Sequence, residues 1–134
     1  MIKMYLTDAE WQVMECLWDN GGLTGREAVC LLQEKMGWSR STTLTLLRRL
    51  ESKNAVSSQS EDGPKTFFSA IKREDAALKE TKNFLDRIYK GSLSLMVSSL
   101  TEKEALSKEE IDKLYDLLKQ LEEGNGSLQA GRIF

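Results

Sequence analysis

The chain has 134 residues, of which 40% are hydrophobic, and this length suits one domain or a small domain with an oligomerisation arm. The formal charge of −2 gives no overall attraction to nucleic acid, so a DNA contact has to rest on a local excess of cations. The chain contains no histidine, which removes the commonest general base and the commonest metal ligand together. We therefore expect no enzyme, no metal site and no cofactor.

The two cysteines, Cys16 and Cys30, lie within apolar helical patterns and form neither a C-x-x-C nor a C-x-C pair. We expect both to be small core residues. The sequence has no signal peptide and no run of about eighteen apolar residues, so the chain is predicted to be cytoplasmic and not inserted in a membrane.

Capping patterns predict two helices near the N-terminus. Thr7-Asp8-Ala9-Glu10 is a capping box that opens a helix over 8–19, and Asn20-Gly21-Gly22 ends it. A second box, Thr24-Gly25-Arg26-Glu27, opens a helix that runs to Gly37. The apolar positions expected to be buried on these two helices are Trp11, Met14, Leu17, Trp18, Val29, Leu32 and Met36.

A third helix is predicted from the cap at Ser39 to a stop near Asn54, because asparagine tolerates the left-handed conformation that ends many helices. One face of this helix holds Leu46, Leu47 and Leu50 at helical spacing, which is typical of a packed face. The opposite face holds hydroxyl and guanidinium groups near the helix N-terminus, and these groups suit phosphate oxygens and base edges. The segment from 35 to 53 carries five cations and one anion.

The pattern then changes to a period of two. Segments 56–60 and 66–71 are predicted strands of a hairpin, joined by the turn Glu61-Asp62-Gly63-Pro64. Three helices followed by a hairpin is the winged helix-turn-helix order. The expected fold is mainly α with a small β-hairpin wing. A winged helix domain over 1–72 is followed by a helical dimerisation arm over 73–123 and a tail, predicted to be unstructured, over 124–134.

The arm is predicted to contain three amphipathic helices: 73–89, a second after the break at Lys90-Gly91, and a third after the capping box at Ser107. One monomer offers too little core to bury all their apolar stripes, so we expect a symmetric dimer. The alternative is that the helices fold back on the winged helix of an extended monomer. The residues predicted to form the dimer interface are Phe84, Leu85, Ile88, Leu93, Met96, Val97, Leu100, Ile111, Leu114, Tyr115 and Leu118.

Motifs in both halves of the chain resemble the BlaI/MecI family of penicillinase repressors over about residues 5 to 121. They are LTDAEWQVMECLW at 6–18, WSRSTT at 38–43, LLRRL at 46–50, FLDRIYKG at 84–91 and LTEKEALSKEEI at 100–111. The resemblance implies a homodimer that occupies a palindromic DNA operator and blocks transcription. It also implies release by cleavage in the arm through a membrane sensor-protease pathway, with the cut aligned at Ser99-Leu100.

The residues predicted to contact DNA are Arg40, Ser41, Thr42, Leu44, Thr45, Arg48, Arg49 and Lys65. Among them, Leu44 is expected to pack on a thymine methyl group, and Arg49 to hold either a phosphate or a carboxylate of the first helix. The wing turn is acidic, so any wing contact is expected from Lys65 or from backbone groups. An alternative function from another class is a winged-helix module that binds protein without sequence-specific DNA binding. The acidic wing and the net negative charge favour this alternative.

Overall fold

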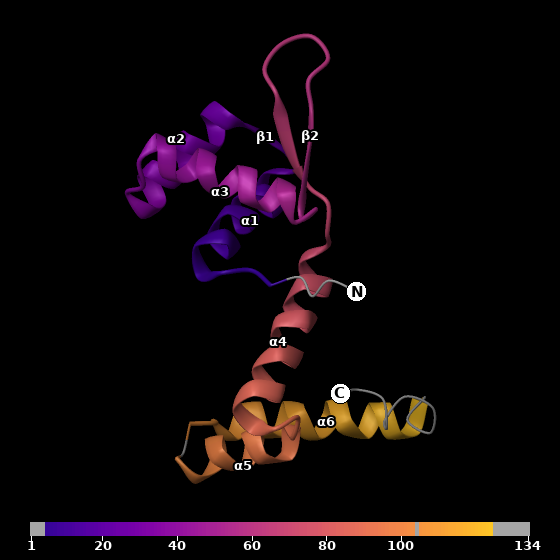
Figure 1. Cartoon of the computed structure of the whole chain (residues 1–134). Helices are drawn as coiled ribbons and strands as arrows, with labels where there is room; N and C mark the ends of the chain where they lie inside the picture. Colours follow the sequence, from indigo (N-terminus) through magenta and orange to yellow (C-terminus); the bar gives the residue numbers. More distant parts are fainter. Residues whose placement is uncertain (1–4, 104, 125–134) are drawn as a thin grey trace. The chain divides into compact units, whose positions relative to one another are not determined.

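A computed structural model describes residues 5–103 and 105–124, and it is mainly helical with one small antiparallel sheet, which confirms the predicted fold class. Figure 1 shows the elements along the chain. They are α1 (Asp8–Asn20), β1 (Leu23–Thr24), α2 (Gly25–Met36), α3 (Arg40–Ser52), β2 (Val56–Gln59), β3 (Thr66–Ser69), α4 (Arg73–Tyr89), α5 (Leu93–Glu102) and α6 (Lys108–Gly124). The chain divides into two compact units, one ending at Glu80 and the other beginning at Thr81.

Side-chain caps fix where the first three helices begin. Thr7 Oγ1 accepts a hydrogen bond from Glu10 N at 3.2 Å, and Glu10 Oε1 accepts one from Thr7 N at 2.8 Å. Thr24 and Glu27 form the same reciprocal pair at the start of α2. Ser39 Oγ accepts from Thr42 N at 3.3 Å at the start of α3. All three predicted caps are therefore confirmed, and each satisfies a backbone donor that a helix N-terminus leaves without a partner.

The end of α3 follows the prediction for Asn54, which has a φ of 64°. Asn54 N donates to Glu51 O at 3.0 Å, and Ala55 N donates to Leu50 O at 2.9 Å. These two bonds form a Schellman motif, which satisfies the last carbonyl groups of the helix and turns the chain into β2.

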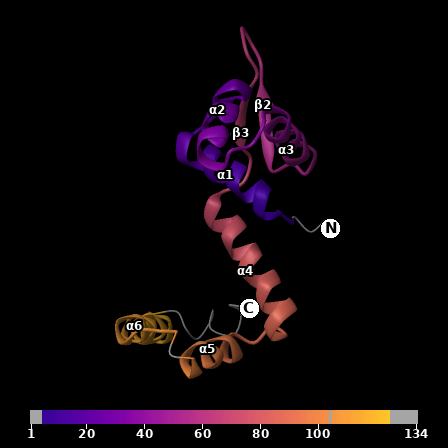
Figure 2. The same cartoon turned by 90° about the vertical axis from the view of Figure 1, so that its left-hand side faces the viewer.

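The sheet has a third strand that was not predicted. Its order is β1-β3-β2, and Leu23 of β1 lies opposite Phe67 of β3. Gly22, with a φ of 136°, lies so close to the neighbouring strand that an added Cβ would be 2.6 Å from Phe68 Cε1. A two-residue strand is too short to show a period, so only the glycine could have marked this close approach. Figure 2 shows the hairpin loop between β2 and β3 projecting beyond the three helices.

One hydrophobic core joins α1, α2, α3 and the sheet. Its buried members are Leu6, Val13, Met14, Cys16, Leu17, Leu23, Ala28, Leu32, Leu46, Leu47, Leu50, Ala55, Val56 and Phe67. The predicted packed face of α3 is therefore confirmed. Four predictions of burial are wrong or only partly right: Cys30 and Met36 are exposed on α2, and Trp11 and Trp18 are half-buried. The apolar stripe of α2 is narrower than the sequence suggests, because its partners α1 and α3 cover only one side of it.

Glu10 is a fully buried carboxylate that links the first helix to the third. Its Oε1 atom lies 2.7 Å from Lys53 Nζ, which also donates to the carbonyl oxygen of Tyr5 at 2.6 Å. Burial by itself raises the pKa of Glu10, but the hydrogen bonds from Lys53 and Thr7 outweigh it and hold the pKa below its ordinary value. Lys53 therefore neutralises an internal charge and adds nothing to the free cations of segment 35–53.

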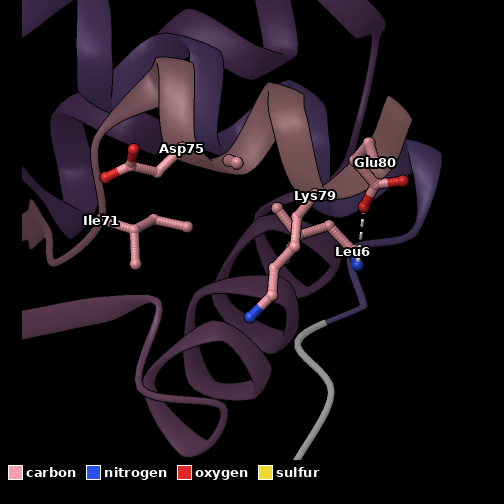
Figure 3. A pocket seen from close by; sticks show the side chains of 6 residues that line it. Leu6, Ile71, Asp75, Lys79 and Glu80 are labelled. Carbon is pink, nitrogen blue, oxygen red and sulfur yellow. Dashed lines mark hydrogen bonds between the residues drawn. The ribbon is translucent and has the colours of Figure 1, made fainter. Parts of the chain in front are cut away.

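The first two turns of α4 belong to the N-terminal unit. Leu6 N donates to Glu80 Oε1 at 3.3 Å, as Figure 3 shows, and Ala76 is buried between these turns and the rest of the unit. A small pocket in this place is lined by Leu6, Ile71, Asp75, Ala76, Lys79 and Glu80. The compact unit thus extends beyond Lys72, where the sequence places the domain boundary. The boundary at 72/73 stays a prediction.

The C-terminal unit contains the end of α4 together with α5 and α6. The predicted break between α4 and α5 is confirmed, because Lys90 and Gly91 both have positive φ. At the start of α6, Ser107 Oγ accepts a hydrogen bond from Glu110 N at 3.1 Å, as its capping pattern predicts. Neither α5 nor α6 contains a buried residue, whereas Leu85 of α4 is only 1% exposed. The predicted tail falls almost entirely on residues 125–134, which lie outside the described part of the chain.

Candidate nucleic-acid interface

Helix α3 presents a polar face to solvent, opposite the leucines that pack in the core. Arg40, Ser41, Thr42, Thr45, Arg48 and Arg49 are all exposed. The three arginines form no side-chain hydrogen bond or ion pair with any residue in 5–103 or 105–124. Their charges are therefore available to a ligand.

The geometry of this face fits a groove of double-stranded DNA. Arg40 and Arg48 are eight residues apart, which corresponds to about 12 Å along a helix axis. The major groove of B-DNA is also about 12 Å wide. Arg40 and Arg48 thus lie near the two ends of the exposed face, with Thr45 between them along the helix axis, and a helix with such a face is of a size that the major groove admits. The hydroxyl groups of Ser39, Ser41 and Thr42 gather at the N-terminus of the helix, where the helix dipole favours anions.

Leu44 and Thr43 are less accessible than their neighbours on α3. Leu44 is half-buried and packs against the core, and a methyl group added at Gly25 would lie 3.5 Å from Leu44 Cδ2. This packing leaves only part of its side chain for the thymine methyl contact that the sequence suggests. Thr43 is fully buried, and its Oγ1 atom has no hydrogen-bond partner within the described ranges.

The structure contradicts one of the two contacts predicted for the Arg49 side chain. The expected alternatives were a phosphate or a carboxylate of the first helix. The side chain is exposed, and no ion pair joins it to α1 in the part of the chain that the structure describes. The carboxylate alternative is therefore wrong. The two carboxylates of α1 that form ion pairs in the described residues, Glu10 and Glu15, are paired with Lys53 and Arg73. The phosphate alternative stays a prediction.

The wing is tied to α3 by a contact that sequence reasoning missed. Glu51 of α3 lies 3.5 Å from Lys65 Nζ and accepts a hydrogen bond from Ser58 Oγ on β2. Lys65 Nζ also lies 5.3 Å from the centre of the Phe67 ring. Lys65 is half-exposed, so it can still face a phosphate, but its position is set by the helix beside it. No sequence signal points to this contact, because Glu51 and Lys65 come from different elements.

The tip of the wing carries the charges that DNA repels. Glu61 and Asp62 are exposed in the loop between β2 and β3, next to Gly63 and Pro64. The only intramolecular bond described in this loop is the one from Ser60 Oγ to Gly63 O at 3.1 Å, and it leaves both carboxylates unpaired within the described residues. A phosphate contact at the wing must therefore come from Lys65 and the strands, not from the tip.

The residues predicted to join two subunits differ widely in exposure within one chain. Phe84, Ile88, Ile111, Tyr115 and Leu118 are exposed, and Tyr115 reaches 73%. Half-buried members are Leu93, Met96, Val97, Leu100 and Leu114. Leu85 is buried. The structure also exposes Leu95 and Leu117, at 52% and 58%, which the prediction left out.

The bond between Ser99 and Leu100 lies inside a helix. Helix α5 continues to Glu102, so the aligned cut falls within the last turn of this helix. Thr101 Oγ1 donates to Ser98 O at 2.9 Å, and Ala105 N donates to Leu100 O at 2.9 Å, and both bonds hold the last turn together. Ser99 and Leu100 are each half-buried.

Two other features are absent from the described residues. No helix there is both long and apolar enough to cross a membrane. No group of three or more cysteine, aspartate or glutamate side chains within 5–103 and 105–124 is arranged to hold a metal ion.

Several known proteins are similar in sequence to this chain. A family model described as "Penicillinase repressor" matches residues 6–120. The penicillinase repressor of Bacillus licheniformis is 32% identical over 115 residues, covering 86% of this chain and 90% of that protein. The methicillin resistance regulatory protein MecI of Staphylococcus aureus strain N315 is 30% identical over 115 residues, covering 86% of this chain and 94% of that protein.

Solved structures show the same N-terminal fold. The DNA-binding domain of the repressor BlaI matches with a TM-score of 0.51 and 27% identity, covering 55% of this chain and 90% of that structure. The monomeric form of Bacillus licheniformis BlaI in complex with the blaP half-operator matches with a TM-score of 0.50 and 27% identity, at the same coverage. The predicted winged helix is thereby confirmed, and the family consists of transcriptional repressors and not of enzymes. With its winged helix, its exposed arginine face on α3 and a family match over residues 6–120, this chain belongs to the penicillinase repressor family.

Proposed function

We propose that this protein is a repressor that binds a palindromic DNA operator as a homodimer. The observation that carries the proposal is the exposed face of α3, where three arginines have no partner within the described chain. A relative in the same family, BlaI, has been solved in complex with half-operator DNA. Repression follows because a dimer that occupies an operator blocks access of the transcription machinery to the promoter.

Charged side chains and hydroxyl side chains both contribute to the free energy of DNA binding. Arg40 and Arg48, at the ends of the exposed face, neutralise phosphates or donate to guanine, and Ser41, Thr42 and Thr45 donate to phosphate oxygens or base edges. Arg49 and Lys65 add phosphate contacts at the edge of the same surface. Positive charge is therefore supplied locally, by a surface of a few residues, on a chain whose net charge is −2.

The proposal is tested by selecting duplexes from randomised DNA with the full-length protein and titrating the best of them at several salt concentrations. The logarithm of the binding constant should fall linearly with the logarithm of salt concentration, with a slope of about −0.9 for each phosphate neutralised. The selected duplexes should contain two inverted half-sites. Enrichment of no sequence, or binding without salt dependence, would instead support a winged-helix module that binds protein.

Dimerisation is proposed to use the apolar surface of the C-terminal unit. Ile111, Tyr115, Leu117 and Leu118 of α6 are exposed although they occupy an amphipathic helix. Burial of apolar area contributes about 25 cal/mol per Å², so exposure of such a stripe is costly for a monomer. A second copy of the same helix can cover it with matched chemistry, because a symmetric interface places the same patch on both subunits.

Release from the operator is proposed to follow cleavage in the arm at Ser99-Leu100, possible only where α5 unwinds locally. Such a cut separates α6 from the rest of the chain and removes its apolar stripe from the dimer. An engineered protease site at this bond tests the mechanism. The nicked protein should sediment as monomers and lose operator affinity while keeping its affinity for a half-site. Nicked protein that stays dimeric on the operator would contradict the mechanism.

A further inference from the structure

The place where α4 leaves the winged helix is held by a cluster of four side chains that the proposed function does not use. Arg73, the first residue of α4, forms a two-pronged ion pair with Glu15 of α1: Nε lies 2.9 Å from Oε1, and Nη2 lies 3.0 Å from Oε2. The same guanidinium group lies over the rings of Trp11 and Trp18, at 5.8 Å and 5.9 Å from their centres. We name these four residues the arm clamp.

The two tryptophans are themselves fixed. Their rings meet edge to face with centres 5.2 Å apart. Trp11 Nε1 donates to Glu15 Oε2 at 3.1 Å, and Trp18 Nε1 donates to Ser69 Oγ at 2.8 Å and to Ile71 O at 3.0 Å. The clamp therefore holds the end of β3, the short connection after it and the first residue of α4 on one rigid face of α1.

A second attachment lies two helical turns further along α4. Glu80 Oε1 accepts the hydrogen bond from Leu6 N. Residues 73 and 80 are seven apart and so lie on the same face of the helix. Ala76, buried between them, lets the helix approach the winged helix closely. One attachment would leave α4 free to pivot, whereas two attachments about 10 Å apart fix the direction of its axis.

The energetics favour a directional role over a stabilising one. The Arg73 side chain is 55% exposed, and exposed ion pairs contribute little to stability because water screens their charges. A fork-shaped pair that is also stacked on two rings has one favoured geometry, because the planar guanidinium group matches the carboxylate at two points. Loss of the pair should therefore change where α4 points without unfolding the winged helix.

We propose that the arm clamp sets the direction in which α4 leaves the DNA-binding unit and so selects the spacing between the two half-sites of the operator. Arg73 and Glu15 are positioning residues for this specificity and do not touch DNA. The inference rests on the proposed function, since only a dimer that binds two half-sites has a spacing to select. Helix α4 continues from the clamp to Tyr89, so it connects the winged helix to the C-terminal unit.

The test uses the full-length protein with Arg73→Met, which keeps the apolar stem over the tryptophans but removes the charge and both hydrogen bonds. Glu15→Gln removes the partner charge with little change of shape. Lys72→Met is the matched control, because it removes a neighbouring exposed cation that has no side-chain partner among the described residues. Each protein is titrated with the duplex selected by the wild type, with versions whose centre is lengthened or shortened one base pair at a time, and with a single half-site.

Wild type and Lys72→Met should bind one spacing best, because avidity of about 10²–10⁴ is lost when geometry forbids both half-sites to be engaged together. Arg73→Met and Glu15→Gln should keep their half-site affinity while the ratio between best and worst spacing falls at least about tenfold. A ratio unchanged from wild type would overturn the proposal. Loss of half-site binding would overturn it too, since the clamp would then support the winged helix itself. If wild type selects no paired half-sites, it is the proposed function that fails.

Discussion

Arg40 and Arg48 differ from Lys53 in what their side chains touch, although all three belong to the cationic segment 35–53. The ammonium group of Lys53 faces the buried Glu10, whereas the two guanidinium groups face solvent. A count of charge along the sequence treats them alike. Replacement of either arginine should therefore weaken DNA binding, whereas replacement of Lys53 should lower the free energy of unfolding.

The two arginines carry the first prediction. Replacing Arg40 or Arg48 by Ala should weaken operator binding by about 1–3 kcal/mol if the residue reads a base, or reduce the salt slope by about one if it holds a phosphate. Titration of each variant at several salt concentrations distinguishes the two roles. Arg87→Ala, which removes an exposed cation from α4, is the matched control and should leave both quantities unchanged. Unchanged affinity and unchanged salt slope in both variants would show that this face of α3 does not contact DNA.

The second prediction at this scale concerns acid stability. The pKa of Glu10 in the folded chain lies below its ordinary value of 4.5, so the unfolded chain binds a proton at this site more readily. The resulting stabilisation is complete above the ordinary pKa and is lost as pH falls through the lowered one. Glu10→Gln should therefore reduce the free energy of unfolding at pH 7 by about 1–3 kcal/mol and flatten its acid dependence.

Urea unfolding followed by tryptophan fluorescence measures this effect, because all three tryptophans, Trp11, Trp18 and Trp38, lie in the N-terminal unit. Glu34→Gln, on an exposed position of α2, is the control and should behave as wild type. Equal acid dependence in the Glu10 variant and in wild type would show that the buried pair does not govern acid unfolding.

Among the elements, the wing has a base that is held against α3 and a tip whose negative charges repel DNA. Glu51 holds Ser58 and Lys65 close to α3, while Glu61 and Asp62 extend with the loop. If the loop approaches the DNA backbone, its two carboxylates reduce affinity at every sequence alike. The wing would then limit non-specific binding more than it selects an operator.

Reversal of the tip charges is the third prediction. The variant Glu61→Lys/Asp62→Lys should bind all duplexes more tightly, and its salt slope should steepen by about one for each new phosphate contact. Glu122→Lys/Glu123→Lys on α6 makes the same change of net charge far along the chain and should alter the slope little. Competition between selected and random duplexes measures the loss of specificity. Equal slopes for the two double variants would show that the tip stays away from the backbone.

Local chemistry explains which elements could be predicted. The capping boxes at Thr7 and Thr24 and the left-handed Asn54 act within a few residues, so the sequence alone places these helix ends. Strand β1 escaped prediction because its pairing partner lies more than forty residues away and its own length is two residues. Cys30 was misplaced for a related reason: whether an apolar position is buried depends on which helices pack beside it.

The same limit applies to the candidate site. Exposure of Arg40, Thr45 and Arg48 followed from the helical period, because the leucines on the other face had to be buried. The ties from Glu51 to Lys65 and from Glu15 to Arg73 join elements that only the fold brings together, and no spacing in the sequence encodes them. Exposed side chains that are proposed to bind DNA were thus easier to predict than the contacts that hold the elements in place.

At the scale of the whole molecule, the fourth prediction separates DNA binding from dimerisation. A fragment ending at Glu80 keeps the ion pair of Arg73 and the bond from Leu6 to Glu80, so it should fold as a monomer with full half-site affinity. It should bind the two-site operator far more weakly than the full chain, because the second half-site no longer adds through linkage. A fragment ending at Lys72 lacks both contacts and should melt at a lower temperature.

Analytical ultracentrifugation and thermal melting check these fragments. A dimeric Glu80 fragment, or a full chain that is monomeric at micromolar concentration, would contradict dimerisation through the C-terminal unit. Equal melting temperatures for the two fragments would show that the first turns of α4 add nothing to the N-terminal unit.

The helical setting of the Ser99-Leu100 bond has a consequence for timing. Proteases bind their substrates in extended form, so an intact last turn of α5 hides this bond and only the transiently unwound fraction of molecules can be cut. If the arm is cut at this bond as proposed, the helix acts as a delay between the appearance of an active protease and the loss of repression. The length of that delay depends on how readily the turn opens, and a change such as Ser98→Ala, which favours the helix, would lengthen it without altering either residue of the cut bond.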